Sequence, residues 1–391
     1  MRQAVVFGAG KIGRGFLGQL FCQSGYFITF VEAVPLVAEE LNRRGAYTIQ
    51  VAADPPSRFR VEGFRALAAR QVEAVGEAVA RADIAATSVG VPNLPGLGPL
   101  VAAGLQRRLA RRGGPLDVVV CENLLDAPNV LRRKVLESMP ETLRQVVDEA
   151  LGCVGTVVSR MVPDIPPEFV RKDPLYTSVE PYCILPVDST AFKAGIPPVQ
   201  GFEPCDKIHG FEERKLFTHN CGHAVAAYLG FLAGYRYTWE AMADPEVLGA
   251  SRGAMEESGR ALIPRHGFRP EDYRAHVEDL LSRFANRGLG DTVARVGRDV
   301  LRKLGRMDRL VGAARLCEEY GVPPRNIALG IAAALLYREP SDPSASLMAR
   351  LIGESGLEGF LQAHCGIRPD EPLGELVLAQ HTRLLKGRRV S

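Results

Sequence analysis

The chain has 391 residues, 46% of them hydrophobic and 24% charged, with a formal net charge of +3; this is the composition of an ordinary globular protein long enough for two domains. No apolar run approaches the roughly 20 residues that a membrane span requires, and the first residues lack the pattern of a signal peptide. Eight irregularly spaced cysteines without a C-x-x-C pair argue against a disulfide framework and a zinc site. We expect a cytoplasmic protein with reduced thiols and no membrane partner.

In the first half of the chain, short β-branched runs alternate with helical patterns. We expect strands at residues 4–8, 27–32, 84–88, 116–121, 154–158 and 176–185. Helical spacing covers residues 12–24, 35–44, 97–112 and 127–151. This alternation predicts an α/β fold with a mostly parallel, doubly wound sheet of the Rossmann type.

The pattern changes in the second half. Residues 186–204 are rich in proline and glycine and predict a linker or crossing loop. Beyond them, helical segments dominate, at residues 211–234, 245–265, 270–284 and 327–337. We therefore expect a Rossmann-type domain over residues 1–205 and a mainly α-helical domain over residues 206–391.

A glycine-rich loop, Gly8-Ala-Gly10-Lys-Ile-Gly13, joins the first expected strand to the first helix. Gly8 permits a tight turn, Gly10 lets the backbone approach a pyrophosphate, and Gly13 permits close packing of helix on strand. The helix N-terminus then offers N–H donors to the phosphates. The loop predicts a dinucleotide cofactor, which makes residues 1–205 the cofactor-binding domain. The expected cofactor-binding residues of the loop are Gly8, Ala9, Gly10, Lys11, Ile12 and Gly13.

Glu32 ends the second expected strand. A carboxylate there accepts hydrogen bonds from the adenosine ribose and repels a 2′-phosphate, so we expect NAD rather than NADP. Nearby arginines, Arg14, Arg43 and Arg44, leave NADP open, and Glu32 is alternatively a solvent-facing strand end.

Polar residues follow two later strands. The carboxyl ends of the strands of a doubly wound sheet line its ligand crevice, so Ser88, Val89 and Gly90 are expected to face the cofactor. Asn123 follows the next strand and is expected near the nicotinamide or the reacting carbon. The alternative is that Asn123 caps the helix that follows.

The segment Lys215-Leu-Phe-Thr-His-Asn220-Cys-Gly-His223 places a lysine, an amide and an imidazole on one predicted helix. At about 100° per residue, Asn220 lies roughly 140° and His223 roughly 80° from Lys215. A lysine beside an amide and an imidazole is a plausible general base for an alcohol. The alternatives are a surface lysine and a core histidine. His219, four residues before His223, is not expected to form a metal pair with it, because no third ligand follows from the spacing.

Four strings occur in order along the chain: the GAGxIGRGF string at residues 8–16, Cys121-Glu-Asn123, Ser159-Arg-Met-Val-Pro163 and the K-x4-N-x2-H string at residues 215–223. Together they resemble the polyol-specific long-chain dehydrogenase family. Further strings, such as those at residues 211–218 and 253–259, resemble the members that act on a polyol phosphate. The resemblance runs over most of the chain and is weakest near the C-terminus.

The resemblance implies a reversible, NAD-dependent oxidation of D-mannitol 1-phosphate to D-fructose 6-phosphate without a metal, at a site between the two domains. It implies that Lys215 is the general acid/base, which requires its pKa to fall from about 10.4 towards working pH. It further implies that Asn123 and Asn220 stabilise charge on the reacting oxygen, and that His223 orients substrate hydroxyls or Lys215. Rival readings are a relative acting on an unphosphorylated polyol or a hexuronate, and a non-catalytic NAD-responsive protein.

A substrate phosphate requires cations or helix N-terminal N–H groups. Arg298, Arg302 and Lys303, in a basic stretch of the helical domain, are the candidates, and a solvated surface stripe is the alternative. The basic runs at residues 107–112, 132–134 and 386–389 lack interleaved aromatics, so we expect solvated helix faces and no nucleic-acid partner. We expect a monomer or weak dimer.

Overall fold

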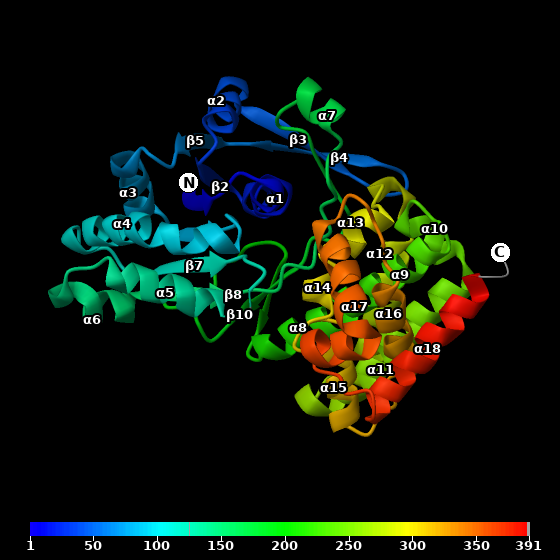
Figure 1. Ribbon diagram of the computed structural model, residues 1–391. Coiled ribbons are helices and arrows are strands. Elements are labelled where there is room, and N and C mark those ends of the chain that lie inside the picture. The colour runs from blue at the N-terminus through cyan, green and yellow to red at the C-terminus, as the bar shows by residue number, and fades with distance from the viewer. Residues whose placement is uncertain (125, 389–391) are drawn as a thin grey trace. The chain divides into compact units, whose positions relative to one another are not determined.

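The computed structural model describes residues 1–124 and 126–388, and its first half is built on a parallel sheet of six strands (Figure 1). In spatial order these are β5 (Phe64–Ala68), β2 (Tyr26–Glu32), β1 (Arg2–Phe7), β6 (Ile84–Thr87), β7 (Leu116–Val120) and β8 (Leu151–Gly155). Numbered along the chain within this sheet, the order is 3-2-1-4-5-6, the doubly wound arrangement with its switch point between β1 and β6. The predicted fold class is confirmed.

Successive residues of β1 face opposite sides of the sheet, and a hydrophobic core lies on each side. Val6 packs in a core with the π-helical turn η1 (Gly13–Leu17), α1 (Gly18–Gln23) and α2 (Pro35–Arg44). Val5 packs in the second core with α3 (Val72–Arg81), α4 (Gly98–Ala110), α5 (Ala127–Glu137) and α6 (Glu141–Ala150). The sheet is therefore buried on both faces, which is why its strands read as continuous apolar runs.

Several stretches differ from the prediction. No element was predicted for β5 or α3. Residues 46–62, for which no element was predicted, form an antiparallel pair of β3 (Ala46–Val51) and β4 (Ser57–Glu62), to which β9 (Thr177–Val179) adds in parallel. The single strand expected at 176–185 is wrong, because β9 and β10 (Leu185–Asp188) belong to separate sheets. The expected linker at 186–204 includes part of a two-stranded sheet of β10 and β11 (Phe202–Cys205). The helical segments expected at 127–151 are present as α5 and α6, with Pro140 as the N-cap of α6.

Arg160 ties the segment that follows β8 to the first helical segment. The side chain is 4% exposed, and its guanidinium donates to the Gly15 carbonyl at 2.9 Å, to Gln19 Oε1 at 2.8 Å and to the Glu180 carbonyl at 2.9 Å and 3.1 Å. Burial lowers the pKa of this guanidinium. Each of these hydrogen bonds satisfies a donor that would otherwise be buried without a partner.

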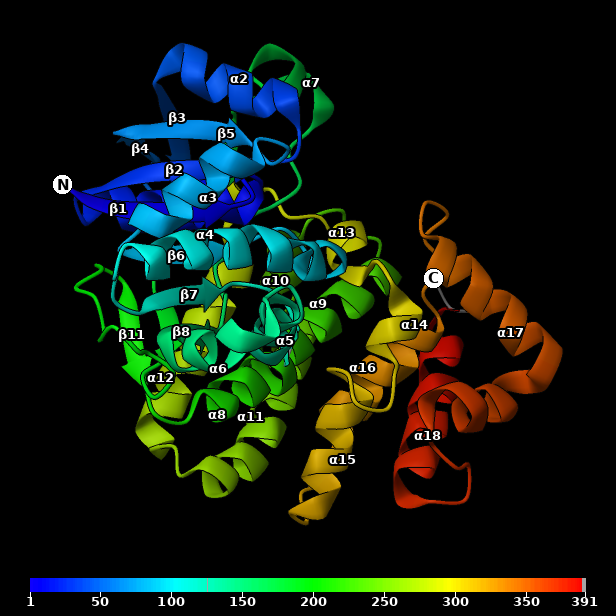
Figure 2. The ribbon, with the colours of Figure 1, turned by 90° about the vertical axis from the view of Figure 1, so that its left-hand side faces the viewer.

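The chain folds into two compact units, Met1–Glu212 and Glu213–Ser391, and the second unit is helical (Figures 1 and 2). Its centre is α9 (Asn220–Leu232), in which every residue from Cys221 to Tyr228 is buried. Packed against α9 are α10 (Thr238–Ala243), α11 (Pro245–His266), α13 (Val293–Gly297) and α16 (Arg325–Leu335). The unit is completed by α12 (Pro270–Phe284), α14 (Val300–Lys303), α15 (Val311–Glu319), α17 (Pro343–Phe360) and α18 (Pro372–Arg388). Within the described residues, no helix has the length and apolarity of a membrane span.

Candidate active site

The glycine loop lies at the switch point of the sheet. Gly8 has φ +90°, and a Cβ added there would lie 2.5 Å from the Ser88 carbonyl oxygen. A Cβ on Gly13 would lie 1.9 Å from the Gly8 carbonyl oxygen, whereas a Cβ on Gly10 would meet nothing within 4 Å. The outer two glycines are thus required by packing within the protein, and Gly10 borders open space. This arrangement fits a pyrophosphate against the loop.

Glu32 braces the glycine loop from the end of β2. It is 8% exposed, and its carboxylate accepts from Ala9 N at 2.7 Å and from Val34 N at 2.8 Å. Two carboxylate oxygens provide about four lone-pair sites, so acceptor capacity remains for a ribose hydroxyl. Arg14 donates to the Ala9 carbonyl, and Lys11 pairs with Asp164.

Arg14, Arg43 and Arg44, the arginines that could bind the 2′-phosphate of NADP, all make contacts within the protein. Arg43 and Arg44 both pair with Glu40, and Arg44 also pairs with Asp173 at 2.7 Å. Arg14 is 8% exposed, and burial lowers its pKa.

A glutamate that the sequence reasoning missed orders the loop after β6. Glu122 is 8% exposed and accepts from Val89 N at 2.8 Å and from Gly90 N at 2.9 Å. These two N–H groups are therefore engaged by the protein itself. Burial raises the pKa of Glu122, and the hydrogen bonds from Val89, Thr87 and Gly90 oppose that rise.

Ser88 and Asn123 lie at the carboxyl ends of β6 and β7. The Ser88 hydroxyl donates to the Gly8 carbonyl at 3.1 Å, which joins the two loops. Asn123 lies in an exposed bend, and Asp126, not Asn123, is the N-cap of α5. The alternative role of Asn123 as the helix cap is therefore wrong.

The segment from Lys215 to His223 does not form the continuous α-helix expected at residues 211–234. After α8 (Ile208–Arg214) comes a π-helical turn, η3 (Lys215–His219), closed by a hydrogen bond from Asn220 N to the Lys215 carbonyl. A π-turn holds one residue more than an α-turn, which rotates the following residues by roughly 100° relative to Lys215. Asn220 then lies roughly 40° from Lys215, and His223 roughly 20° on the other side. On these ideal angles, all three residues lie on one narrow face.

Tertiary contacts hold the π-turn. The Thr218 hydroxyl bonds to the Tyr273 hydroxyl on α12. Phe217 packs against the first turn of α15, where a Cβ on Gly312 would lie 2.8 Å from the Phe217 ring. Lys215 and Asn220 are half-buried.

Both histidines of the segment are buried beside Phe284. The His223 ring stacks on Phe284 with centroids 4.4 Å apart and planes 5° apart, and the His219 ring lies 5.5 Å from the same phenyl group. Burial lowers the pKa of His223 to about 3 and that of His219 well below its usual value, with Arg283, His223 and Lys215 adding to the second effect. Both imidazoles are thus neutral at ordinary pH. Within the described part of the chain, no cluster of three metal-ligating side chains occurs.

An acid–base pair beside His223 was also missed. Asp291 Oδ2 lies 3.6 Å from His223 Nε2, and the carboxylate, 1% exposed, is held by both Nε and Nη2 of Arg295. The spacing of Asp291 and Arg295, four residues apart, was the available signal.

The three expected phosphate ligands differ in environment. Arg298 and Arg302 are exposed, and Arg302 pairs with Asp299 at 2.5 Å and with Asp308 at 3.1 Å. Lys303 is 5% exposed, and within the described residues its ammonium donates to the Arg298 carbonyl and makes no ion pair. Its pKa is lowered to about 7, by burial first and then by Arg309 and Arg302.

Arg309 is a further cation of this cluster. It is paired with Asp308 at 2.8 Å. Arg309 and Lys303 both contribute to lowering the pKa of His223, so their charges act on the same side chain as Asp291 does. Arg302, Lys303 and Arg309 interact electrostatically with two carboxylates, Asp299 and Asp308, so the cluster carries one positive charge in excess when Lys303 is protonated.

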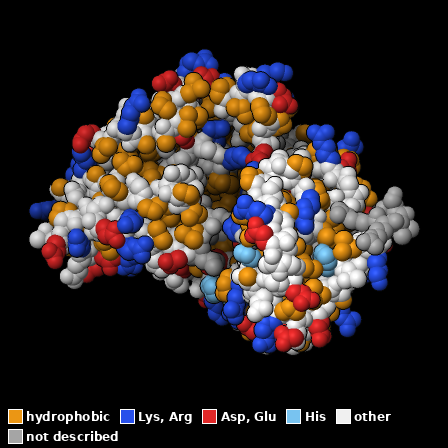
Figure 3. All heavy atoms as spheres, in the orientation of Figure 1, with side chains coloured by type: hydrophobic (Ala, Val, Ile, Leu, Met, Phe, Trp, Pro, Cys, Tyr) orange, Lys and Arg blue, Asp and Glu red, His pale blue; other side chains and the backbone are white. Residues whose placement is uncertain are grey.

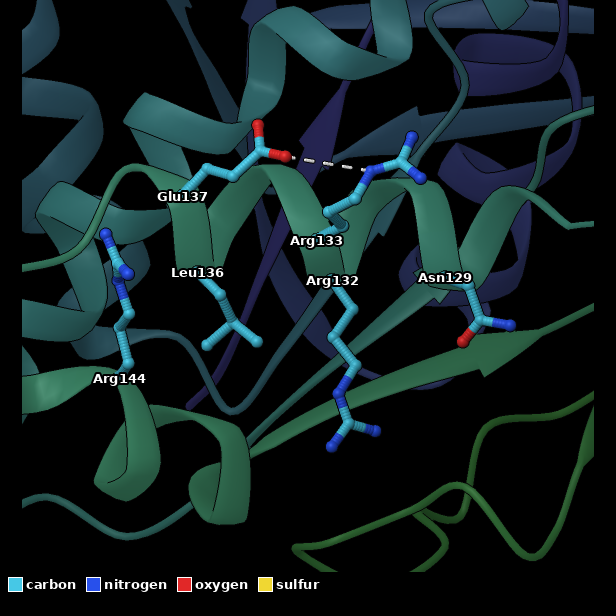
Figure 4. A pocket seen from close by; sticks show the side chains of 6 residues that line it. All are labelled: Asn129, Arg132, Arg133, Leu136, Glu137 and Arg144. Carbon is cyan, nitrogen blue, oxygen red and sulfur yellow. Dashed lines mark ion pairs between the residues drawn. The ribbon is translucent and has the colours of Figure 1, made fainter. Parts of the chain in front are cut away.

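The basic runs of the first unit are paired with acids. Arg107 of α4 pairs with Glu73 of α3, and Arg111, the C-cap of α4, pairs with Glu77 of α3. Figure 3 shows basic and acidic side chains interspersed over the face that it draws. A pocket of about 390 Å³ between α5 and α6 carries Arg133 paired with Glu137 (Figure 4), and none of its residues is a predicted site residue. The pocket is lined by Asn129, Arg132, Arg133, Leu136, Glu137 and Arg144.

A glycine loop at the switch point of a 3-2-1-4-5-6 sheet, followed by a helical unit with a lysine, an amide and an imidazole in one short segment, is the arrangement of a dinucleotide-dependent dehydrogenase. Family models agree with this class. The mannitol dehydrogenase Rossmann domain matches residues 2–201, and the mannitol dehydrogenase C-terminal domain matches residues 207–350. The chain belongs to the mannitol dehydrogenase family.

Similar proteins span its whole length. The mannitol-1-phosphate 5-dehydrogenase of Brevibacillus brevis is 39% identical over 97% of this chain and 98% of its own. That of Geobacillus thermodenitrificans is 36% identical over 98% and 99%. Among solved structures, Pseudomonas fluorescens mannitol 2-dehydrogenase, in a ternary complex with NAD and D-mannitol, has a TM-score of 0.75 at 19% identity, covering 99% of this chain and 92% of that one. A D-sorbitol dehydrogenase has a TM-score of 0.82 at 19% identity, covering 98% and 93%. These two show the shared fold.

Proposed function

We propose that this protein is an NAD-dependent mannitol-1-phosphate 5-dehydrogenase, which interconverts D-mannitol 1-phosphate and D-fructose 6-phosphate. The observation that carries the proposal is its 39% identity to a mannitol-1-phosphate 5-dehydrogenase along essentially the full length of both chains. The glycine loop and the Lys215 face supply the two parts that such a reaction requires.

NAD, when bound, accepts a hydride from the carbinol carbon. Gly10 borders the open space into which a pyrophosphate fits, and Glu32 retains acceptor capacity for the ribose. Glu32 also places a negative charge where a 2′-phosphate would lie, while Arg43 and Arg44 are paired with Glu40. These contacts favour NAD over NADP.

Lys215 is the proposed proton acceptor. An amine accepts a proton only in its neutral form, so during oxidation Lys215 takes the hydroxyl proton, and during reduction it returns that proton to the oxygen. The π-turn brings the Asn220 amide to the same face, where it can donate to the oxygen as negative charge develops. Asn123 is the proposed second amide donor. His223, neutral and fixed on Phe284, is proposed to orient a substrate hydroxyl.

Lys303 is the best supported of the candidate phosphate ligands. Among the residues that the structure describes, no carboxylate pairs with the buried Lys303 ammonium, which makes its burial costly, and a phosphate would supply a negative charge. Arg309 belongs to the same cluster and is added to the proposed ligands. Arg302 already pairs with two carboxylates, which makes it and the exposed Arg298 weaker candidates.

A substrate panel tests the function directly. The full-length protein should oxidise NADH with fructose 6-phosphate, and should do so poorly with NADPH, with fructose or with a hexuronate. Equal rates with fructose would transfer the assignment to an enzyme of unphosphorylated polyols. Absence of activity on the whole panel, together with intact NADH binding, would favour a non-catalytic NAD-responsive protein.

A further inference from the structure

His223 is neutral at ordinary pH, because its pKa is low. Its tautomer, however, is not fixed by the pKa. Burial is the main cause of its low pKa, Asp291 opposes that effect, and Arg295, Arg309 and Lys303 reinforce it. A neutral imidazole has one N–H donor and one acceptor nitrogen. What His223 can do for a substrate therefore depends on which nitrogen carries the hydrogen.

Asp291 lies on the Nε2 side of that ring. Its Oδ2 is 3.6 Å from Nε2, and a carboxylate in an ion pair can only accept. A hydrogen on Nε2 is attracted to this oxygen, whereas a lone pair on Nε2 would be repelled by it. The stack on Phe284 fixes the plane of the ring.

The position of Asp291 is set by its own surroundings. Arg295 grips its carboxylate through two nitrogens, and the Asp291 carbonyl accepts from Thr238 N at 2.9 Å. Thr292, the next residue, caps α13 by accepting from Arg295 N at 3.2 Å, which places the arginine one turn from the aspartate. The carboxylate is thus fixed by backbone and side chain before any ligand binds.

We propose that Asp291, held by Arg295, keeps His223 in the Nε2–H tautomer, so that Nδ1 is the acceptor for a hydroxyl of the polyol substrate. The identity of that ligand rests on the proposed function; the tautomer does not. At 3.6 Å, the buried Nε2 makes no hydrogen bond to any described residue, and such contacts tighten when substrate binds. Carboxylates fix imidazole tautomers in this way in other active sites. Asp291 is a positioning residue.

Nitrogen NMR of the full-length protein with ¹⁵N-labelled histidine tests the tautomer without substrate. The His223 signals are identified by their loss in His223→Gln. At neutral pH we expect a protonated Nε2 and an unprotonated Nδ1, and in Asp291→Asn a mixture of tautomers or the reverse one. An Nδ1–H tautomer in the wild type, or an unchanged pattern in Asp291→Asn, overturns the proposal.

Kinetics test the consequence for catalysis. Asp291→Asn should lower kcat/KM by about 10- to 100-fold, with NADH binding unchanged. In a His223→Ala background the same substitution should have little further effect, because the two residues act as one unit. Glu278→Gln is the matched control, since it removes an exposed carboxylate that pairs with Arg252 and should leave the rate unchanged. A full additional loss in the His223→Ala background overturns the proposal. Inactivity of the wild type on every polyol phosphate overturns the proposed function instead, while the NMR result still decides the tautomer.

Discussion

Lys303 provides the sharpest test of the phosphate site, because activity and stability should respond in opposite directions. Lys303→Met keeps a similar buried stem and removes the ammonium. If the ammonium binds the phosphate, a charge-assisted hydrogen bond worth about 1.5–3 kcal/mol is lost, and the KM for fructose 6-phosphate should rise about 10- to 150-fold. Arg306→Met, at an exposed cation of the same segment, is the matched control and should change KM little.

The stability effect follows from the pKa of about 7 in the folded protein, compared with an ordinary value of 10.5. Between these values the unfolded state binds the proton and the folded state does not, so the penalty is fully present below pH 7 and shrinks as pH rises towards 10.5. A shift of this size corresponds to a few kcal/mol, on the order of 1.4 kcal/mol per pKa unit. Lys303→Met should therefore raise the Tm at neutral pH by about 3 °C or more.

The pH dependence of KM shows whether the charge of the Lys303 side chain, rather than its shape, is responsible for phosphate binding. Only the ammonium form binds phosphate well, so in the wild type the affinity for fructose 6-phosphate should fall about tenfold from pH 6 to pH 8. Lys303→Arg stays charged and should lose this dependence, while the ionisation of the phosphate itself affects both proteins alike. The assays are steady-state NADH oxidation and thermal unfolding. A KM that does not change in Lys303→Met, or a Tm that falls together with activity, would refute the reasoning.

Three further outcomes follow from the two halves of the site. Lys215→Ala should lower kcat by about 100- to 10,000-fold while NADH fluorescence titration shows unchanged binding, and a near-normal kcat would remove Lys215 from the mechanism. Insertion of one alanine after Leu216 should rotate Lys215 away from Asn220 by roughly 100° and abolish turnover in a protein whose circular dichroism is retained; an active insertion variant would contradict the role given to the turn. Gly10→Ala should weaken NADH binding at an unchanged Tm because its Cβ enters open space, whereas Gly13→Ala should lower both because its Cβ would lie 1.9 Å from a carbonyl oxygen; equal Tm values for the two variants would contradict this distinction.

The sheet and the glycine loop were predictable because each is written in consecutive residues. A buried parallel strand reads as an apolar run, and a loop that must approach a phosphate reads as glycines at fixed spacing. The strands β3 and β4 were not predicted because neither is buried on both faces: one face is half-buried in β3 and exposed in β4, which weakens the apolar signal.

The π-turn could not be predicted from the same kind of pattern. One inserted residue changes the spacing of apolar positions too little to be seen, and the turn is held by Tyr273 and by the segment around Gly312, both far along the chain. Asp291 lies beside His223 although the two residues are far apart in the sequence. No local periodicity could therefore predict that they are neighbours. The burial of Lys303 also depends on tertiary packing. The sequence alone therefore cannot distinguish this buried lysine from the exposed Arg302 beside it.

The hydrogen bonds of Arg160 bear on how this protein could be recombined with its relatives. A fragment ending with β8 would contain all six strands of the parallel sheet, yet it would leave the Gly15 carbonyl and Gln19 without their guanidinium partner. It would also remove β9 from β3 and expose part of the core beneath α1. The smallest transplantable nucleotide-binding module therefore extends at least through β11, and chimeras within the family should be joined beyond residue 205 rather than at the edge of the sheet.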